Sequence, residues 1–568
     1  MILVELLLLL LAGGLGLWGA HWSLDTVLGV TALRGQSGDA TVALAAGQTG
    51  MLWFGAGVAL VALARGATHF RRGQHVATPL LLPAVYAAAS LGLVVQYGYG
   101  NPYVQGWTGP AFAQGVFYGS VIVAAILAFP GDLAGLIHRF RPVLAGTVVL
   151  LFAALYLFGT EPGGSGARIN LGPIQPIEIV KVAAVLFLGS WLGQRAAKLR
   201  FQRMKLLALT FPRPRLLLPA IAALFGALSG LFLVHDLGPT LILGGVFLGL
   251  FYVVTRSSGW VLLSLSGLAA MLAFFGFFPE LAPAASVELR LRMWLDPWYN
   301  ALAHGDQLVA AFWTMAAGGL TGTGIGSGWP GALPAGHTDL AFAHVVEELG
   351  LVGGLLYLAC LGTAITDGLR VAIHNRTPER VLMATALALL LAWQAAVILG
   401  GTLGLIPLTG VVVPFLSYGK SGMAAFLGVA ALIARLGEDG QVRTDTEELR
   451  ELREAVQRVQ VAVVGVVVLF GATTAVRALW HRDDVTLRGA VTTLGDGTPR
   501  LIADPRIAAL AASIRRGPIL DRNGIVLAEN VELNNRLYPL GSALGTLLGP
   551  PEGGLLRARW SVERQQDT

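Results

Sequence analysis

The sequence predicts an all-α protein that crosses a membrane many times and ends in a small β-containing segment. The chain has 568 residues, of which 55% are hydrophobic and only 13% are charged. A soluble protein of this length would carry about twice that charged fraction. Its apolar runs reach the roughly 17–25 residues that a helix needs to span a bilayer. Thirteen spans are predicted, at residues 2–20, 50–65, 79–98, 113–130, 143–159, 177–195, 216–234, 238–255, 259–278, 348–370, 381–402, 410–436 and 461–480.

The distribution of basic residues predicts the orientation of these spans. Lys and Arg are concentrated in the loops at 65–75, 138–142, 195–215 and 369–380, which follow every second span. Loops on the cytoplasmic side carry this excess of basic residues. The N-terminus is therefore expected in the cytoplasm, and the tail that follows the last span is expected outside it.

Composition also excludes several classes of function. The net charge of +6 comes from basic loops between spans, so it reflects topology and does not indicate a nucleic-acid partner. The single cysteine, Cys360, excludes an intrachain disulfide and a metal site built from cysteines. Glu5 is the only early charge, and a signal peptide would begin with basic residues, so we expect the first run to be a retained span.

The chain after residue 436 has a different character. Residues 441–460 are highly charged and rich in good helix formers, which favours a cytoplasmic helical connector before the last span. The tail has strand-like runs around Asn523-Gly524, a dipeptide that is typical of a β-hairpin turn. We expect five parts: two extra N-terminal helices (1–78), a helical core (79–436), the linker (437–460), an anchor (461–480) and the extracytoplasmic tail (481–568).

Residues 334–350, PAGHTDLAFAHVVEELG, concentrate ionisable groups at the mouth of an apolar span. Such groups are costly near a bilayer and usually line a pathway or an active site. If the stretch is helical, Asp339 and Glu347 share one face and His344 and Glu348 form a second i, i+4 pair. The alternative is a helix start whose polar groups lie in water.

A Gly-rich run, GGLTGTGIGSG at 318–328, follows a predicted short re-entrant helix at about 307–317. No strand precedes the run and it is predicted to lie outside the cell, so we interpret it as a flexible or closely packed loop. The sequence YGKSG at 418–422 lacks the earlier Gly and the strand that a phosphate-binding P-loop requires.

Five sequence elements occur in the order typical of one family. The chain resembles the SEDS family (shape, elongation, division and sporulation), which includes FtsW, RodA and SpoVE, over about residues 79–436. The family has ten spans, so two extra spans precede this region and one follows it. The elements are GARINLGPIQPIEIVK (166–181), HDLGPT (235–240), RLRMWLDPW (290–298), the stretch 317–350 and IPLTGVVVPFLSYGKSG (406–422).

The resemblance implies a peptidoglycan glycosyltransferase of the bacterial plasma membrane that polymerises lipid II, a disaccharide-pentapeptide on undecaprenyl pyrophosphate. Such a site needs a base for the acceptor hydroxyl, cations for the departing pyrophosphate and an apolar groove for the lipid. A divalent cation that bridges the pyrophosphate is compatible with this chemistry, and the sequence leaves the cofactor open.

The position of the catalytic base departs from the family pattern. The resemblance places the family's candidate catalytic Asp at Asn300, three residues after Pro297, and an amide cannot act as a base. Either another carboxylate substitutes, or the protein is a non-catalytic scaffold of wall synthesis. A precursor transporter is a third alternative, although the sequence lacks the two similar halves that transporters show. The candidate catalytic residues are Asp296, Asn300, Asp306, Asp339 and Glu347.

Several residues are candidates for substrate binding. Arg168 and Arg290 lie in predicted outer loops, where planar guanidinium groups suit phosphate. Lys181 lies in a span three residues after Glu178, so it either binds phosphate or forms a structural ion pair. Asp236 either lines a pocket or caps the next helix. Lys420 stands where the family usually has Gly, and it either adds positive charge near the site or snorkels to the membrane surface. The full candidate set is Arg168, Lys181, Asp236, Arg290, Gln307, His337, Thr338, Glu348, Ser417 and Lys420.

The tail carries a second resemblance. Residues 514–528 and 536–549 resemble the start of the membrane-proximal pedestal of class B penicillin-binding proteins, for which the span at 461–480 would be the anchor. No Ser-x-x-Lys and no Lys-Thr-Gly follows residue 440, so the crosslinking chemistry of that family is not encoded. A separate class B penicillin-binding protein is therefore an expected partner, beside lipid II and membrane lipid.

Overall fold

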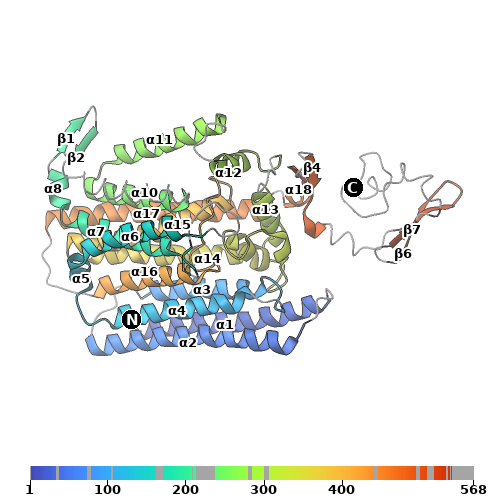
Figure 1. The fold of residues 1–568 in the computed structure, drawn as a ribbon, viewed down its shortest axis with the longest axis horizontal. Coiled ribbons are helices and arrows are strands. Elements are labelled where there is room, and N and C mark those ends of the chain that lie inside the picture. Colours follow the sequence, from blue (N-terminus) through green and yellow to red (C-terminus); the bar gives the residue numbers. More distant parts are fainter. Residues whose placement is uncertain are drawn as a thin grey trace.

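The helical fold class predicted from composition is confirmed. In the computed structural model, eleven helices among the described residues are long and apolar enough to cross a membrane, and they lie side by side in one bundle (Figure 1). Helix α11 (Ser258–Phe277) coincides with a twelfth predicted span, and the predicted span 216–234 lies outside the described residues. The structure describes residues 2–33, 38–72, 79–103, 107–160, 170–172, 174–201, 203–206, 209–212, 237–278, 285–299, 306–438, 446–480, 482–493, 499–507, 517–532, 535–537 and 539.

Two N-terminal helices pack against the rest of the bundle. Helix α1 (Ile2–Leu33) lies against α3 (Leu81–Gly98), and α2 (Ala40–Arg72) lies against α4 (Thr108–Ala128). Arg65 donates from Nε to Glu5 Oε1 at 3.0 Å and also contacts the carboxylate of Glu438, and all three side chains are buried. The early acidic residue that marks the first run as a retained span is therefore part of a buried ion-pair network.

Helix α14 (Ala341–His374) occupies the middle of the bundle and contacts α3, α13 (Asp306–Gly318), α15 (Pro378–Thr402), α16 (Lys420–Glu438) and α17 (Glu447–Leu479). It begins seven residues before the predicted span, so the ionisable stretch forms its first turns. The helix is interrupted at Gly350, whose φ of 68° favours glycine. The Gly-rich loop supplies the hydrogen bonds that this break removes. Thr323 N donates to Glu347 O, Gly324 N donates to Glu348 O, and Leu351 N donates to Gly319 O.

The remaining helices complete the bundle. The predicted re-entrant segment is a helix, α13, and the predicted connector and anchor form one continuous helix, α17. Thr446 caps α17 by accepting from Leu449 N, and two glutamates in the first turn suit the helix dipole.

The basic loop after α7 holds a short hairpin that the sequence did not predict. The other bounds are α5 (Leu133–Arg139), α6 (Arg141–Phe158), α7 (Pro176–Gly193), α8 (Ala196–Phe201), β1 (Arg203–Leu206), β2 (Leu209–Pro212), α10 (Leu237–Thr255), α12 (Ala285–Leu295) and the 3-10 turn η2 (Pro330–Ala332).

The tail contains the predicted hairpin and docks on the bundle. Strands β5 (Ile519–Leu520) and β6 (Val526–Glu532) pair antiparallel around Gly524, whose φ is 81°, and β7 (Asn535–Leu537) pairs with β6. The first part of the tail comprises α18 (Arg482–Leu487), β3 (Ala490–Thr493) and β4 (Pro499–Ile502). Trp313 of α13 donates from Nε1 to Arg488 O at 3.1 Å, and Val309 and Trp313 pack with Ala490 in a small core. This part of the tail lies with α12 and α13 at one end of the bundle (Figure 1).

Candidate functional site

The segment before α14 is a series of turns, which changes one sequence expectation. Residues 334–340 are in turn conformation and the helix begins at Ala341. Asp339 therefore does not share a helical face with Glu347, and that prediction was wrong. The second predicted pair is present, because both His344 and Glu348 lie in α14, with His344 Nε2 at 3.5 Å from Glu348 Oε1.

Asp339 instead lies beside Arg290 of α12. A Cβ added at Gly410 would lie 3.4 Å from Asp339 Oδ2 and also 3.4 Å from Arg290 Nη2, so both side chains border the same small space. Arg290 Nη1 donates to Thr409 O at 2.9 Å, which fixes the guanidinium next to this glycine. Gly410 has a φ of 72°, so a residue with a side chain would be strained there. Both side chains are half-buried and come from different sequence elements.

The turn that carries Asp339 is fixed by buried polar side chains. Ser417 Oγ donates to Thr338 O at 2.5 Å and accepts from Val413 N at 2.6 Å. Gln96 of α3, which is buried, donates from Nε2 to both His337 O and Leu416 O at 2.9 Å. Tyr418 N donates to His337 O at 2.7 Å. The segment 337–339 is thus held against 413–418 by several buried hydrogen bonds.

His337 and Tyr99 form an aromatic wall next to this turn. Their ring centroids lie 5.1 Å apart, and the ring of Tyr418 lies 6.0 Å from that of His337. Burial lowers the pKa of His337, because the imidazolium form loses water without gaining an anionic partner. Burial raises the pKa of Tyr99. Both rings are therefore neutral near pH 7.

The first turns of α14 hold a second cluster, the carboxylate–imidazole cluster of His344, Glu347 and Glu348. All three side chains are almost completely buried. His344 Nδ1 lies 3.0 Å from Glu347 Oε2, and the ring of Tyr99 lies edge-on against the His344 ring at 5.3 Å. The Gly-rich loop packs on this cluster, since a Cβ at Gly328 would approach His344 Cε1 to 2.8 Å. That loop is closely packed, which was one of the two expectations for it.

The carboxylate–imidazole cluster is completed by a residue of the tail. Arg506 donates to Glu347 Oε1 from Nε at 2.9 Å and from Nη2 at 2.6 Å. It also donates to Thr314 Oγ1 of α13 at 2.9 Å and to Asp504 Oδ1 at 3.2 Å. Trp329 N donates to the same Glu347 oxygen at 2.9 Å. Sequence analysis missed Arg506, because it lies far from the family elements and no motif marks it.

Lys181 and Lys420 have defined partners. The ion pair expected for Lys181 is present, with Nζ 2.8 Å from Glu178 Oε1, and Nζ also donates to Gln394 Oε1 at 2.8 Å. The side chain is buried inside the bundle, as a structural ion pair would be. Lys420 is exposed at the start of α16 and donates to Gln114 Oε1 at 2.8 Å.

The remaining candidates are less informative. Asp296 is exposed at the end of α12 and accepts from Tyr299 N at 3.3 Å, and Gln307 is half-buried on α13. Asp306 begins α13, but its side chain lies outside the described residues. Among the described residues, no group of three or more His, Cys, Asp or Glu side chains could hold a metal ion. The candidates that lie outside the described residues are Arg168, Asp236 and Asn300.

Four of the five family elements therefore meet at one end of the bundle. Element 290–298 contacts 406–422 through Arg290, element 317–350 contacts 406–422 through Thr338, and Gln175 N of element 166–181 donates to Ser421 Oγ at 3.2 Å. The family model for FtsW, RodA and SpoVE, described as a cell cycle protein, matches residues 79–441. The chain belongs to the FtsW/RodA/SpoVE family.

Individual relatives agree with this FtsW/RodA/SpoVE assignment. The chain is 33% identical over 401 residues to the peptidoglycan glycosyltransferase RodA of Mycobacterium leprae, covering 68% of this chain and 84% of that protein. It is 30% identical over 274 residues to the stage V sporulation protein E of Bacillus subtilis, covering 47% and 70%. A solved chain from work on the structural coordination of polymerization and crosslinking by a peptidoglycan synthase complex has the same fold. Its TM-score is 0.51 at 24% identity, covering 63% of this chain and 97% of that chain.

Proposed function

We propose that this family member is a peptidoglycan glycosyltransferase that polymerises lipid II at the outer face of the bacterial plasma membrane, during cell elongation or division. The names of its relatives, RodA and FtsW, support this activity. The basic loops support an orientation with the N-terminus in the cytoplasm and the tail outside. The end of the bundle that carries the family elements and the tail would then face the outer leaflet.

The observation that carries the proposal is that Asp339 and Arg290 both lie close to Gly410. A carboxylate and a guanidinium that lie close together can act on the two reacting groups of a glycosyl transfer, which are the acceptor hydroxyl and the leaving pyrophosphate. Asp339 would accept the proton of the acceptor sugar hydroxyl as its oxygen bonds to the anomeric carbon of the donor. The bond from that carbon to the pyrophosphate oxygen breaks at the same time, and Arg290 would stabilise the departing negative charge.

Two of the other candidate carboxylates, Glu347 and Asp296, are less suited to the role of base. Glu347 is almost fully buried, and its oxygens already accept from Arg506, Trp329 and His344. Asp296 is exposed to solvent at a helix end. Asp339 is half-buried and lies near the guanidinium of Arg290 in the segment that joins the family elements.

Polymerisation of lipid II by the purified full-length protein tests the proposal. The variant set is Asp339→Asn, Asp296→Ala and Asn300→Asp, with Asp25→Asn, an exposed carboxylate on α1, as the matched control. We expect glycan strands from the wild type and the control, and a rate lower by about 10²–10⁴ in Asp339→Asn, the usual size of an acid–base contribution. Loss in Asp296→Ala with full activity in Asp339→Asn would assign the base to Asp296.

Asn300 favours a second candidate function, a non-catalytic scaffold, because an amide stands where the family's candidate base is expected. An inactive wild type together with an active Asn300→Asp variant would establish the scaffold in place of the enzyme. We propose a class B penicillin-binding protein as the partner in either case. The peptidoglycan synthase complex named for the solved structure supports this pairing, and co-purification with such a protein tests it.

A further inference from the structure

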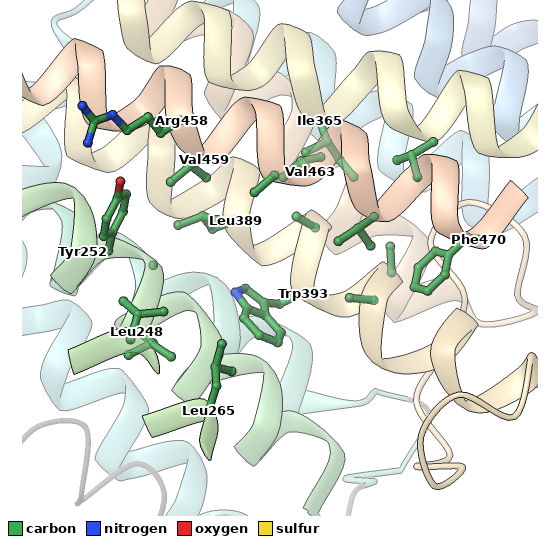
Figure 2. Close-up of a pocket in the computed structure, with 18 of the residues that line it drawn as sticks. Leu248, Tyr252, Leu265, Ile365, Leu389, Trp393, Arg458, Val459, Val463 and Phe470 are labelled. Atoms are coloured by element: carbon green, nitrogen blue, oxygen red, sulfur yellow. The ribbon is translucent and has the colours of Figure 1, made fainter. Parts of the chain in front are cut away.

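An apolar cavity of about 520 Å³ lies within the bundle, away from the candidate site. It is bordered by α10, α11, α14, α15 and α17 (Figure 2). Aliphatic side chains such as Leu248, Leu265, Leu389 and Val463 form most of its wall, and Phe470 borders one end. The volume falls within the roughly 300–1,000 Å³ of ordinary ligand sites.

Two polar groups of this cavity lie together at one end. Figure 2 shows the guanidinium of Arg458 and the hydroxyl of Tyr252 at the end opposite Phe470. Arg458 is exposed, and among the residues that the structure describes no side chain forms an ion pair or hydrogen bond with it. The neighbouring Arg256 is already neutralised by Glu451 and Glu454. Arg458 therefore places a cation at the mouth of this apolar cavity, which is the groove between α17 and the α10–α15 face.

The dimensions of the cavity match one leaflet of a bilayer. Arg458 and Phe470 lie twelve residues apart on α17, which corresponds to roughly 18 Å along a helix axis. Half of the hydrocarbon core of a bilayer is about 15 Å. One acyl chain, with its phosphate at Arg458, would follow this groove toward the middle of the membrane.

The leaflet is the one opposite the candidate site. Arg477 lies nineteen residues beyond Arg458 on α17, stacks 3.8 Å from the Phe312 ring and donates to Leu403 O. The two arginines are thus roughly 28 Å apart along the helix, close to the ~30 Å of the hydrocarbon core. Arg477 marks the end that carries α13 and the tail, and Arg458 marks the other end. A headgroup at Arg458 is therefore too distant to belong to a substrate bound at Asp339.

We propose that this cavity is a binding site for an anionic phospholipid. Arg458 and Tyr252 bind its phosphate, and one acyl chain fills the groove between α17 and the α10–α15 face. The lipid joins the helix that carries the tail to the helical core. That this leaflet is the cytoplasmic one rests on the proposed orientation, whereas the site itself does not depend on transferase activity.

Native mass spectrometry of the full chain, delipidated and titrated with phosphatidylglycerol or phosphatidylcholine, tests the site. The variants are Arg458→Gln, which removes the cation, and Ala396→Phe, which fills the groove. The matched controls are Arg450→Gln, whose side chain is 81% exposed on the same helix, and Val464→Phe, which lies on α17 outside the cavity lining. Size-exclusion profiles identify any variant that fails to fold.

We expect one phosphatidylglycerol per chain in the wild type and both controls, with weaker retention of phosphatidylcholine. Arg458→Gln should lower the apparent affinity for phosphatidylglycerol roughly tenfold, the usual effect of losing a charge-assisted hydrogen bond. Folded Ala396→Phe should retain no lipid. Equal retention by all five proteins would overturn the site. Equal affinity for both lipids would overturn the anionic preference, and a co-purified polyprenyl lipid would overturn the phospholipid assignment.

Discussion

Arg506 and Glu347 form a buried ion pair that joins two parts of the chain 159 residues apart. The guanidinium approaches one carboxylate oxygen to 2.6 Å, and the side chains are 13% and 1% exposed. Glu347 lies within the family region and Arg506 lies in the tail beyond it. The tail therefore supplies part of the environment of the carboxylate–imidazole cluster, which adjoins the turn that carries Asp339.

Replacement of Arg506 by Gln should destabilise the protein. Loss of the guanidinium leaves the buried carboxylate of Glu347 with His344 but without its arginine, and breaking such a buried pair costs about 3–5 kcal/mol. We expect a clearly lower melting temperature in thermal unfolding of the full chain in nanodiscs. Polymerisation should fall as well, because the Gly-rich loop is attached to the same carboxylate through Trp329.

The control for this prediction is Arg522→Gln, which removes an exposed cation from the same tail and should melt like the wild type. The double variant Arg506→Gln/Glu347→Gln should recover part of the lost stability, since both charges are then removed together. An Arg506→Gln protein that melts at the wild-type temperature would contradict the assigned ion pair.

Stability should depend on pH through His337. Burial lowers the pKa of this residue, so below its ordinary value of about 6.5 the unfolded chain binds a proton that the folded protein does not. Stability is therefore lost as the pH falls from about 6.5 toward the lower pKa of the folded state, and it is fully present above that range. His337→Gln should remove this component. Melting temperatures between pH 5 and 8 check it, and identical slopes in both proteins would refute the assignment.

Lys181 should be required for stability more than for chemistry. It is buried between Glu178 and Gln394, and no described contact connects it to Asp339 or Arg290. Lys181→Met alone should destabilise the protein by about 3 kcal/mol, because Glu178 is left as an unpaired buried charge. Lys181→Met/Glu178→Gln should recover most of that loss and retain polymerisation. A folded double variant without activity would instead favour a role for Lys181 in phosphate binding.

Gly322 should tolerate no side chain. Its φ is 85°, and an added Cβ would collide with the backbone carbonyl of Glu348 and approach Gly350 N to 2.7 Å. Gly100 separates backbone strain from steric contact, because its φ is 91° and no atom lies within 4 Å of an added Cβ. We expect Gly100→Ala to cost about 1–2 kcal/mol from backbone strain alone. Gly322→Ala should cost more, as measured by thermal unfolding, and equal losses would exclude a contribution from the close contact.

Features that depend on short spacings along the chain could be predicted from the sequence alone. Apolar length predicted the spans, and Asn523-Gly524 predicted the β5–β6 hairpin because that turn needs a positive φ. The pairs Glu178–Lys181 and His344–Glu348 were also predictable. A helix places residues three and four positions apart on one face wherever it occurs in the fold.

Contacts between residues far apart in the sequence depend on how the helices pack, and the sequence did not reveal them. Asp339 was expected on the face of Glu347, but the helix begins two residues later, and the preceding turn carries its carboxylate toward Arg290 at Gly410. Arg506 reaches Glu347 from a tail whose sequence carries no sign of that contact. The entropic cost of closing a loop grows only slowly with its length, so separation along the chain neither favours nor forbids such contacts. They are set by the packing of the whole bundle, in which a buried charge is stable only with a partner beside it.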